Sequence, residues 1–534
     1  MSRPRGVVEE LVRARAEAHP DAVWLKWLNE EIPWLTALSL SKRAANGLLE
    51  LGVRPGERVA LLLPNRPEFI WTHLAIQIIG AHSVPVNISQ RGAALAHILT
   101  DSGAAAIVFH EELRDAVLSM RHRIPSLRRL VVCEGRAGGG VDWSTERLFA
   151  CADSEPETAA VAGETSRGTG GSSVGMMYTS GTTGPPKGVV TADYDLRPVE
   201  ALVRAAGIRP GETMYTGLPL FHGNALLVSM LGSIFADAKL ALAPRFSASR
   251  LFADCARYGA VEFNTLGGMI SILLKQPPGP LDREHDVRVV LSAGCPANRW
   301  REFEDRFGVR IIEWFGMVDS PGILLNDTGR LGSMGRGGTA GVEFRVVDDA
   351  DRPLGPQEVG ELVFRHPRGA TTSYHNLPEE TARAYRGGWF HSGDLADYDE
   401  DGFFYYRGRK RESMRRLGEN ISAWEIESVL NTHPAVLDCA AHAVASELGD
   451  EDIKVCVVLR PALHVDPGEL LLFCVERMAY HAVPRYVEFL EALPKTATER
   501  NQYATLRERG LTSSTWDRET EGSSWLRSRS PARP

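Results

Sequence analysis

Lysine is scarce in this sequence of 534 residues, since only eight of its 60 basic residues are Lys and the rest are Arg. Long apolar runs are missing as well: none reaches the ~18 residues that a membrane-spanning helix needs. The first 18 residues are basic but contain no apolar stretch of the kind that signal peptides have. We therefore expect no membrane partner and a cytoplasmic location.

Cysteine is present without any pairing pattern. The seven Cys residues are an odd number, they are scattered along the chain, and no two form a C-x-x-C pair. This pattern excludes a disulfide framework and a zinc site, and it favours reduced thiols. A net charge of -8 argues against a nucleic-acid partner.

The length and the order of the patterns predict more than one folded unit, because single cores rarely exceed ~250–300 residues. Helical spacing at 8–18 and 42–51 alternates with short buried strands at 58–63, 106–109 and 130–133. This alternation predicts parallel sheets with helices on both faces. Short alternating strands follow at 342–364, typical of antiparallel sheet or a small barrel. A separate unit is expected from 423 to about 510.

The sharpest local signal is the segment 176–190, MMYTSGTTGPPKGVV, in which an apolar strand leads into a loop rich in Gly and hydroxyl groups. Glycines let backbone N–H groups approach phosphate oxygens, hydroxyls add donors, and a Lys adds positive charge. The loop is not a Walker A motif, since Pro186 stands where that motif requires Gly. The predicted phosphate-binding residues are Thr179, Ser180, Gly181, Thr182, Thr183 and Lys187.

This loop resembles the phosphate loop of the adenylate-forming superfamily, which includes acyl-CoA synthetases, luciferases and peptide-synthetase adenylation domains. Further segments resemble the superfamily's motifs in the expected order over roughly residues 10–515. They are RPGERVALLLPNRPEFI (54–70), LPLFHGNA (218–225), SAGCP (292–296), EWFGMVDS (313–320), GPQEVGEL (355–362), SYHNLPEET (373–381), GGWFHSGDLADYDEDGFFYYRGR (387–409), LGENISAWEIE (417–427) and LPKTATERN (493–501).

The resemblance implies an α/β protein with a large N-terminal adenylate-forming domain and a small mobile α+β C-terminal domain. The large domain, residues 1–410, would contain two α/β subdomains and a small β-barrel. A hinge at 411–413, centred on Glu412 where the superfamily usually has Asp, would lead to the small domain at 414–515. Residues 516–534 are expected to be a disordered polar tail.

The resemblance also implies what individual residues do. Asp394 would hold the ribose hydroxyls with Arg409 nearby, and His222 would border the acyl pocket and the entry of the pantetheine arm. The other residues expected to bind nucleotide are Gly294, Cys295, Pro296, Glu313, Trp314 and Phe315. The other residues expected at the acyl pocket are Gly223, Asn224, Gly267, Gly268, Gly316 and Met317.

The implied reaction has two halves. A carboxylic acid first attacks the α-phosphate of ATP, giving acyl-AMP and pyrophosphate, and the thiol of coenzyme A then attacks the acyl carbon and releases AMP. Positioning and electrostatic stabilisation would carry both steps. Gly418, Glu419 and Asn420 match the loop that lines the thiol tunnel, and the two halves are expected to use two orientations of the small domain.

Two motifs depart from the superfamily's pattern. In the last motif Arg500 replaces the lysine that serves adenylation, and its neighbours Glu499 and Asn501 are changed as well. Arg does not substitute neutrally for a point charge, and loss of one such donor costs ~10²–10³ in rate. In the segment 315–319, Val318 replaces a hydroxyl residue. Asp319 replaces the Glu that usually holds Mg²⁺, which puts Mg²⁺ and pyrophosphate handling in doubt.

Because the departures concentrate in adenylation, the sequence predicts an enzyme that performs chiefly the coenzyme A step on a preformed acyl-AMP, supplied by a separate ligase. Three other functions were considered, of which the first two remain open and the third is disfavoured. They are a conventional ATP-dependent acyl-CoA ligase, a catalytically silent nucleotide- or acyl-binding protein, and a peptide-synthetase unit, which lacks support because no carrier domain follows. The chain also resembles diterpenoid acyl-CoA ligases of platensimycin and platencin biosynthesis, which would imply a bulky terpenoid acid. A homo-oligomer is left open.

Overall fold

The protein was analysed as a computed structural model that describes residues 6–157, 175–179, 186–191, 195–320, 322–337, 341–410, 413–416, 419–445, 451–475, 477–478, 482–496 and 500–520. The chain divides into two compact units. Unit 1 comprises residues 1–344 and 364–390, and unit 2 comprises residues 345–363 and 391–534. The predicted boundary at residue 410 stays a prediction, and the predicted hinge residue Glu412 lies outside the described residues.

The first sheet of unit 1 is parallel throughout, with the strand order β4-β3-β5-β6-β7. Its strands are β3 (Arg58–Leu62), β4 (His82–Pro85), β5 (Ala106–His110), β6 (Arg129–Cys133) and β7 (Trp143–Ser144). The associated helices are α1 (Val7–Ala18), α2 (Trp34–Glu50), α3 (Pro67–Ile78), α4 (Gly92–Asp101), η1 (Glu111–Leu113), α5 (Arg114–Arg121) and α6 (Thr145–Phe149). The helices and strands predicted in this region are confirmed, and the central strands are buried as parallel strands covered on both faces should be.

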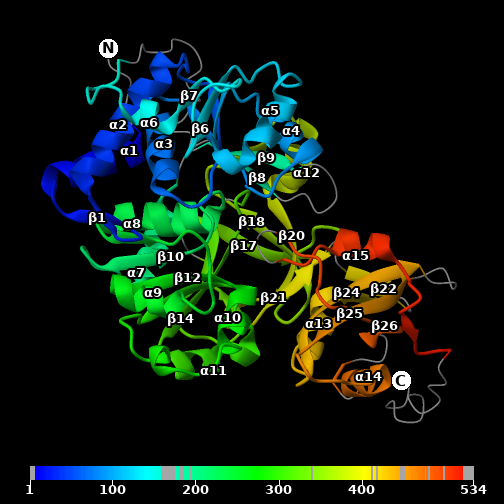
Figure 1. Ribbon diagram of the computed structural model, residues 1–534. Coiled ribbons are helices and arrows are strands. Elements are labelled where there is room, and N and C mark those ends of the chain that lie inside the picture. Colours follow the sequence, from blue (N-terminus) through cyan, green and yellow to red (C-terminus); the bar gives the residue numbers. More distant parts are fainter. Residues whose placement is uncertain are drawn as a thin grey trace. The chain divides into compact units, whose positions relative to one another are not determined.

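The second sheet of unit 1 has eight strands in the order β15-β14-β13-β12-β10-β11-β1-β2. They are β1 (Val23–Trp27), β2 (Glu30–Pro33), β10 (Thr213–Thr216), β11 (Lys239–Leu242), β12 (Ala260–Leu266), β13 (Val289–Ala293), β14 (Arg310–Gly316) and β15 (Ile323–Asn326). The six inner strands run parallel, and only the edge strands β2 and β15 pair antiparallel. Figure 1 shows the labelled strands of this sheet with helices beside them.

Helices cover both faces of the second sheet. They are α7 (Arg197–Ala206), the π-helix η2 (Asn224–Leu231), α8 (Gly232–Ala236), α9 (Leu251–Tyr258), α10 (Gly267–Leu274), η3 (Pro280–Asp282) and α11 (Ala297–Phe307). Asn264 of β12 contacts Asn224 of η2, whereas its neighbour Phe263 packs edge-on against Phe252 of α9. Because adjacent side chains of a strand point to opposite faces, η2 covers one face and α9 covers the other.

A small three-stranded sheet, ordered β19-β9-β8, completes unit 1. It contains β8 (Met176–Thr179), β9 (Lys187–Thr191) and β19 (Thr372–Tyr374), and it is followed by α12 (Pro378–Ala384) and η5 (Arg386–Gly388). The strand β16 (Ser333–Gly335) also belongs to this unit. The β8–β9 pair brackets the predicted phosphate loop, since Thr179 lies opposite Lys187.

Unit 2 begins with a sheet whose strands are ordered β21-β20-β18-β17. They are β17 (Glu343–Val347), β18 (Gly360–Arg365), β20 (Phe390–Tyr398) and β21 (Phe404–Arg409). The border with unit 1 falls within three of them, since residues 343, 344, 364, 365 and 390 belong to unit 1. The short strands predicted at 342–364 are thus confirmed. Strands β20 and β21 pair antiparallel with Asp394 opposite Arg409.

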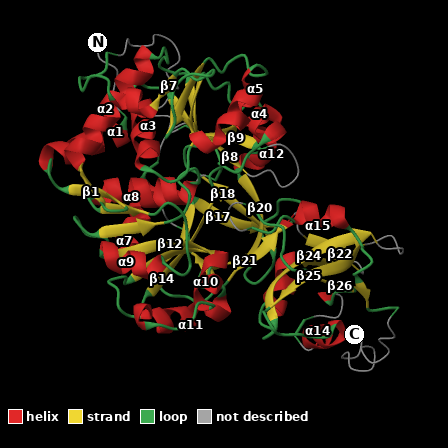
Figure 2. Cartoon of the chain, in the orientation of Figure 1, coloured by secondary structure: helices red, strands yellow, loops and turns green. Residues whose placement is uncertain are grey.

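The C-terminal part of unit 2 has a four-stranded sheet, ordered β24-β25-β26-β27, and a hairpin. The elements are β22 (Ser413–Arg416), β23 (Glu419–Ser422), α13 (Ala423–Leu430), β24 (Val436–Ala445), β25 (Glu451–Leu459), α14 (Pro467–Val475), β26 (Tyr486–Phe489), α15 (Tyr503–Arg509) and β27 (Trp516–Asp517). Figure 2 shows this mixture of helix and strand, as predicted for an α+β domain. Trp516 and Asp517 lie within the predicted polar tail, yet they pair with β26, and Asp517 forms an ion pair with Arg485. Residues 521–534 lie outside the described part.

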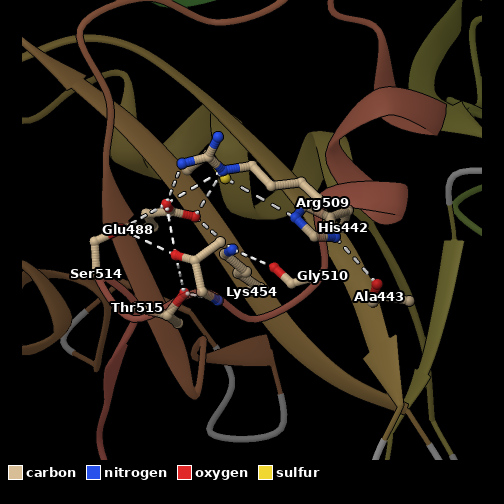
Figure 3. Close-up of polar contacts among 10 residues, drawn as sticks. His442, Ala443, Lys454, Glu488, Arg509, Gly510, Ser514 and Thr515 are labelled. Atoms are coloured by element: carbon tan, nitrogen blue, oxygen red, sulfur yellow. Dashed lines mark hydrogen bonds and ion pairs between the residues drawn. The ribbon is translucent and has the colours of Figure 1, made fainter.

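Inside this domain, Lys454 and Glu488 form an ion pair of 2.5 Å in which both side chains are fully buried. Lys454 also donates to the carbonyl of Gly510, and Arg509 donates to Glu488 (Figure 3). Since Arg509 and Gly510 lie at the end of α15, the buried pair fixes this helix and the chain after it to strands β25 and β26.

Candidate active site

The segments of unit 1 that are predicted to line the acyl pocket and to bind nucleotide lie at the ends of neighbouring parallel strands. Strands β10, β12, β13 and β14 are adjacent in the sheet, and each is followed by one of these segments. The segments begin at Leu218, Gly267, Gly294 and Met317, respectively. Because the carboxyl ends of parallel strands lie along one edge of a sheet, the structure brings these segments to a common edge, where open α/β sheets bind ligands.

The segment after β10 is fixed by a residue that the sequence analysis did not single out. The buried side chain of Asn65 donates to the carbonyl of Leu218 at 2.8 Å and accepts from the N–H of Leu220 at 2.8 Å. His222 and Asn224 follow at the start of the π-helix η2, with the rings of Phe221 and His222 4.7 Å apart. Asn65 lies within the motif at 54–70, and this position was the one sequence feature that could have marked it as a site residue.

The segment after β13 is held by Glu313. Its two carboxylate oxygens accept hydrogen bonds from the backbone N–H groups of Gly294 and Cys295, the second at 3.1 Å. Burial raises the pKa of Glu313 to about 8, and the two backbone hydrogen bonds act in the opposite direction. Gly294 has φ +97°, a conformation that favours glycine. Glu313 therefore shapes the predicted nucleotide-binding loop by holding the backbone of Gly294 and Cys295.

Trp314 and Phe315 lie on opposite faces of β14. Trp314 packs in an apolar cluster with Leu202 and Val228, on the face that η2 covers. Phe315 instead stacks on Phe364, with ring centroids 6.3 Å apart. Alternation along the strand therefore directs the two rings to opposite faces of the sheet, and their predicted role in nucleotide binding stays a prediction.

Two of the predicted pocket glycines differ in the space around them. A Cβ on Gly268 would meet no atom within 4 Å, so Gly268 leaves open space at the start of α10. A Cβ on Gly316 would lie 2.8 Å from Ile323 and 3.2 Å from the ring of Trp314. The second glycine is thus required by packing within the sheet. A Cβ on Gly223 would lie 3.2 Å from Val318.

Asp319, the predicted Mg²⁺ ligand, is buried and already bonded. The hydroxyl of Tyr374 donates to one of its carboxylate oxygens at 2.7 Å, and Thr372 donates to its backbone carbonyl at 2.7 Å. Among the described residues no group of three or more His, Cys, Asp or Glu is placed to hold a metal ion. Asp319 could supply one oxygen to a Mg²⁺ ion that nucleotide phosphates otherwise hold, which is the usual arrangement for this ion.

Lys187, the predicted phosphate-loop cation, lies at the start of β9. Its ammonium group forms an ion pair with Glu380 at 2.6 Å and lies 5.1 Å from the ring centre of Tyr374. Thr179 donates to the carbonyl of Lys187 at 3.5 Å. Ser180, Gly181, Thr182 and Thr183 lie outside the described residues.

In unit 2 the two predicted ribose-binding residues are in contact. Arg409 and Asp394 form an ion pair of 2.6 Å, and Asp394 is only 1% exposed. The backbone of β20 next to Asp394 is braced by Glu361, which accepts from the N–H of Gly393 at 3.1 Å and pairs with Lys410 at 3.0 Å. Burial alone would raise the pKa of Glu361, but hydrogen bonds from His391 and Lys410 lower it to about 2. Glu361 was not among the site residues predicted from the sequence, although the motif at 355–362 contains it.

The last motif carries Arg500 on an exposed loop. Among the described residues, the guanidinium of Arg500 makes no hydrogen bond or ion pair. Lys495, the remaining lysine of this motif, forms an ion pair of 2.5 Å with Asp438 of β24. Gln502 donates to the carbonyl of Lys495 at 2.6 Å. These two contacts therefore hold the loop in place at Lys495.

The thiol-tunnel loop is described only in part. Glu419 and Asn420 belong to β23, which pairs antiparallel with β22. Gly418 lies outside the described residues. The predicted roles of these three residues stay predictions.

Comparison with known proteins fits this arrangement. Residues 12–375 match the family model of the AMP-binding enzymes, and residues 425–500 match that of the AMP-binding enzyme C-terminal domain. The chain belongs to the AMP-binding enzyme family. As a member of this family it is an acyl-CoA ligase of the adenylate-forming superfamily, with a large N-terminal AMP-binding domain and a small C-terminal domain, as its sequence indicated.

Curated relatives of this AMP-binding enzyme include the crotonobetaine/carnitine–CoA ligases of Salmonella paratyphi B and Shigella dysenteriae serotype 1. Each is 31% identical to it, over 484 and 481 residues, respectively, which is 88% of this chain and 90% of the relative. No helix of the described part is long and apolar enough to cross a membrane.

Solved structures agree on the fold. An anthranilate CoA ligase in complex with anthranoyl-AMP gives a TM-score of 0.83 at 24% identity, covering 95% of this chain and 98% of that one. The o-succinylbenzoate coenzyme A synthetase of Bacillus subtilis in complex with AMP gives 0.78 at 25% identity, covering 93% and 98%.

Proposed function

We propose that this AMP-binding enzyme forms coenzyme A thioesters from preformed acyl-adenylates and that its adenylation half-reaction is impaired or lost. In the proposed step, the coenzyme A thiol attacks the acyl carbon. A C–S bond forms, the bond from this carbon to the phosphate oxygen breaks, AMP leaves, and the thiol proton passes to solvent. A separate adenylating ligase would supply the acyl-AMP from a carboxylic acid and ATP.

The observation that carries this proposal is the ion pair between Lys495 and Asp438. With Arg500 at the position of the adenylation lysine, Lys495 is the nearest lysine that could replace it. Its ammonium group is 2.5 Å from Asp438, and its carbonyl is bonded to Gln502. To reach a substrate, Lys495 would have to give up this ion pair, so the motif offers adenylation only a guanidinium.

The segment after β14 supports the same proposal. Val318 presents methyl groups close to Gly223 where the superfamily has a hydroxyl donor for phosphate. One oxygen of Asp319 is occupied by Tyr374. Adenylation must handle three phosphates and Mg²⁺, whereas the thioester step needs only the AMP moiety to be held. The expectation that AMP is held is supported by the Asp394–Arg409 ion pair in unit 2 and, separately, by the Glu313-braced backbone of Gly294 and Cys295 in unit 1.

Two assays on one purified sample test the proposal. ATP–pyrophosphate exchange with a panel of acids measures adenylation, and thioester formation from synthetic acyl-AMP measures the second step. We expect thioester formation without exchange, and an Arg500→Lys variant should raise exchange while leaving the thioester rate unchanged. Robust exchange in the wild type would instead identify a conventional two-step acyl-CoA ligase. Absence of thioester from every acyl-AMP would leave a silent binding protein.

A further inference from the structure

One face of strand β12 carries polar side chains into an apolar layer. Glu262 and Asn264 point toward the π-helix η2, because Asn264 donates to the side-chain carbonyl of Asn224 at 2.7 Å. In the neighbouring strand β13, Val289 and Leu291 stand beside them in register. Both belong to the apolar cluster that also contains Val228 of η2.

These polar side chains are buried but not satisfied. Glu262 is 0% exposed and Asn264 is 2% exposed. Neither oxygen of Glu262, nor the side-chain carbonyl of Asn264, nor the amide nitrogen of Asn224 has a hydrogen-bond partner among the described residues. Two further buried donors on this side, the hydroxyl of Ser229 and the indole N–H of Trp314, also lack partners there.

Such a cluster lowers the stability of the folded state unless a ligand or another group satisfies it. A buried polar group without a partner costs about 1–3 kcal/mol, and native proteins satisfy more than nine-tenths of theirs. Burial raises the pKa of Glu262 well above its ordinary value and so favours the uncharged acid, which has one donor and one acceptor. With the amide of Asn224 and the carbonyl of Asn264, the cluster offers both donors and acceptors.

The cluster lies where an acyl group would be held. Asn224 directly follows His222 and Gly223, and β12 ends at the edge where Gly267 and Gly268 begin α10. Asn224 and Ser229 stand on a π-helix, a rare geometry that occurs frequently at functional sites.

We propose that Asn224 and Asn264, with Glu262 one layer deeper, form a specificity subsite that binds a hydroxyl or carbonyl oxygen of the acyl group, away from its carboxylate. This inference rests on the proposed function. A hydroxyl would donate to the carbonyl of Asn264 and accept from the amide of Asn224. A carbonyl would accept from Asn224 or from the acid of Glu262. A cationic group does not fit, since it would face the Asn224 donor and an uncharged acid.

The test compares four synthetic acyl-adenylates on the full-length enzyme. They are those of cyclohexanecarboxylic acid, its 4-hydroxy and 4-oxo derivatives, and 4-(trimethylammonio)butyric acid. We expect kcat/KM for thioester formation to be at least ~10-fold higher for one of the oxygenated adenylates than for the parent, because a site built to bind a hydroxyl or carbonyl rejects an analogue without it. Isothermal titration calorimetry with the same adenylates, without coenzyme A, measures their affinities and so shows the preference without turnover.

Variants separate recognition from structure. Asn264→Leu should bring kcat/KM for the oxygenated adenylate down to that of the parent without lowering the melting temperature. The matched control is Asn326→Leu, since Asn326 is an equally buried asparagine whose amide donates to the carbonyls of Arg330 and Ser333. That variant should lower the melting temperature and leave the preference unchanged.

Several outcomes would overturn the inference. They are equal kcat/KM and equal affinity for the parent and both oxygenated adenylates, a preference for the ammonium compound, or a uniform loss of activity and stability in Asn264→Leu. Absence of thioester from all four compounds would count against the proposed function instead. In that case the calorimetric preference alone decides whether the subsite exists.

Discussion

Two glutamates, one in each unit of the molecule, are fully buried in opposite surroundings. Glu488 of β26 accepts hydrogen bonds from Lys454, Arg509 and Ser514 (Figure 3). It also accepts one from the hydroxyl of Thr512. Glu262 of β12 has no partner for either oxygen among the described residues. Both side chains are shielded from water to the same extent, so burial alone does not distinguish them.

The comparison separates two uses of a buried carboxylate. Burial alone would raise the pKa of Glu488, but hydrogen bonds from Arg509 and Lys454 lower it to about 2. Glu262 has no such compensation, and burial raises its pKa well above the ordinary value. The first carboxylate ties together elements distant in sequence. The second contributes nothing to the fold that we can identify, which directs attention to a ligand.

The largest expected effect comes from breaking the satisfied cluster. Glu488→Gln leaves the fully buried ammonium of Lys454 without its counter-charge, and breaking a buried pair from one side costs about 3–5 kcal/mol. Urea denaturation at pH 7 should show a loss of this size in the free energy of unfolding. A loss below 1 kcal/mol would mean that solvent reaches Lys454. Glu262→Gln is the matched control, and it should change the free energy of unfolding by less than Glu488→Gln does.

The pH dependence of stability should separate the two residues by sign. The pKa of Glu488 is lower in the folded state, about 2 against 4.5, so its contribution of about 3 kcal/mol is present above pH 4.5 and is lost as the pH falls toward 2. The pKa of Glu262 is higher in the folded state, so its contribution is present below pH 4.5 and is lost as the pH rises.

The measurement is the free energy of unfolding of both Gln variants and the wild type from pH 3 to pH 8. Relative to the wild type, Glu488→Gln should become less stable with rising pH, and Glu262→Gln more stable. Parallel curves would contradict the assignment of opposite charge states.

A smaller effect is expected from removing the unsatisfied carboxyl altogether. Glu262→Met keeps the length of the side chain and removes the buried polar atoms, so the free energy of unfolding should rise by about 1–2 kcal/mol. Thermal and urea denaturation check this. A loss of more than 2 kcal/mol would show that Glu262 has a structural partner after all.

The smallest effect is expected at Lys495 and Asp438, a partly exposed pair. Exposed ion pairs contribute less than about 1 kcal/mol, so Lys495→Met should barely change the free energy of unfolding. The rate of thioester formation from acyl-AMP should also stay the same, because the proposed function gives Lys495 no chemical role. A tenfold loss of that rate would contradict the proposal.

Much of the fold followed from the sequence because it depends on local periodicity. The strands at 58–63 and 106–109 were visible as short buried apolar runs, and motif order placed the segments that the carboxyl ends of β10 to β14 bring to one edge. The roles of the predicted site residues were carried over from the motifs and stay predictions, and the structure shows Asp394 and Arg409 as an ion pair.

Other features depend on distances between segments far apart in the sequence, and no local pattern contains them. Asp438 and Lys495 are 57 residues apart, and Asn65 contacts a segment more than 150 residues away. Glu262 sits in the run AVEFNTL, which shows a polar residue in a strand but not whether a partner waits on the facing helix. Whether a buried polar side chain has a hydrogen-bond partner can be seen only in the three-dimensional structure.

The seven cysteines have a practical consequence. Six are buried, Cys151 is only partly exposed, and burial raises the pKa of every one of these thiols. Alkylating dyes react with the thiolate, so the native chain should label slowly at neutral pH. One substitution, Cys151→Ser, would leave a chemically quiet background. New surface cysteines, one on each unit, could then carry a fluorescent pair and report the distance between the units during turnover.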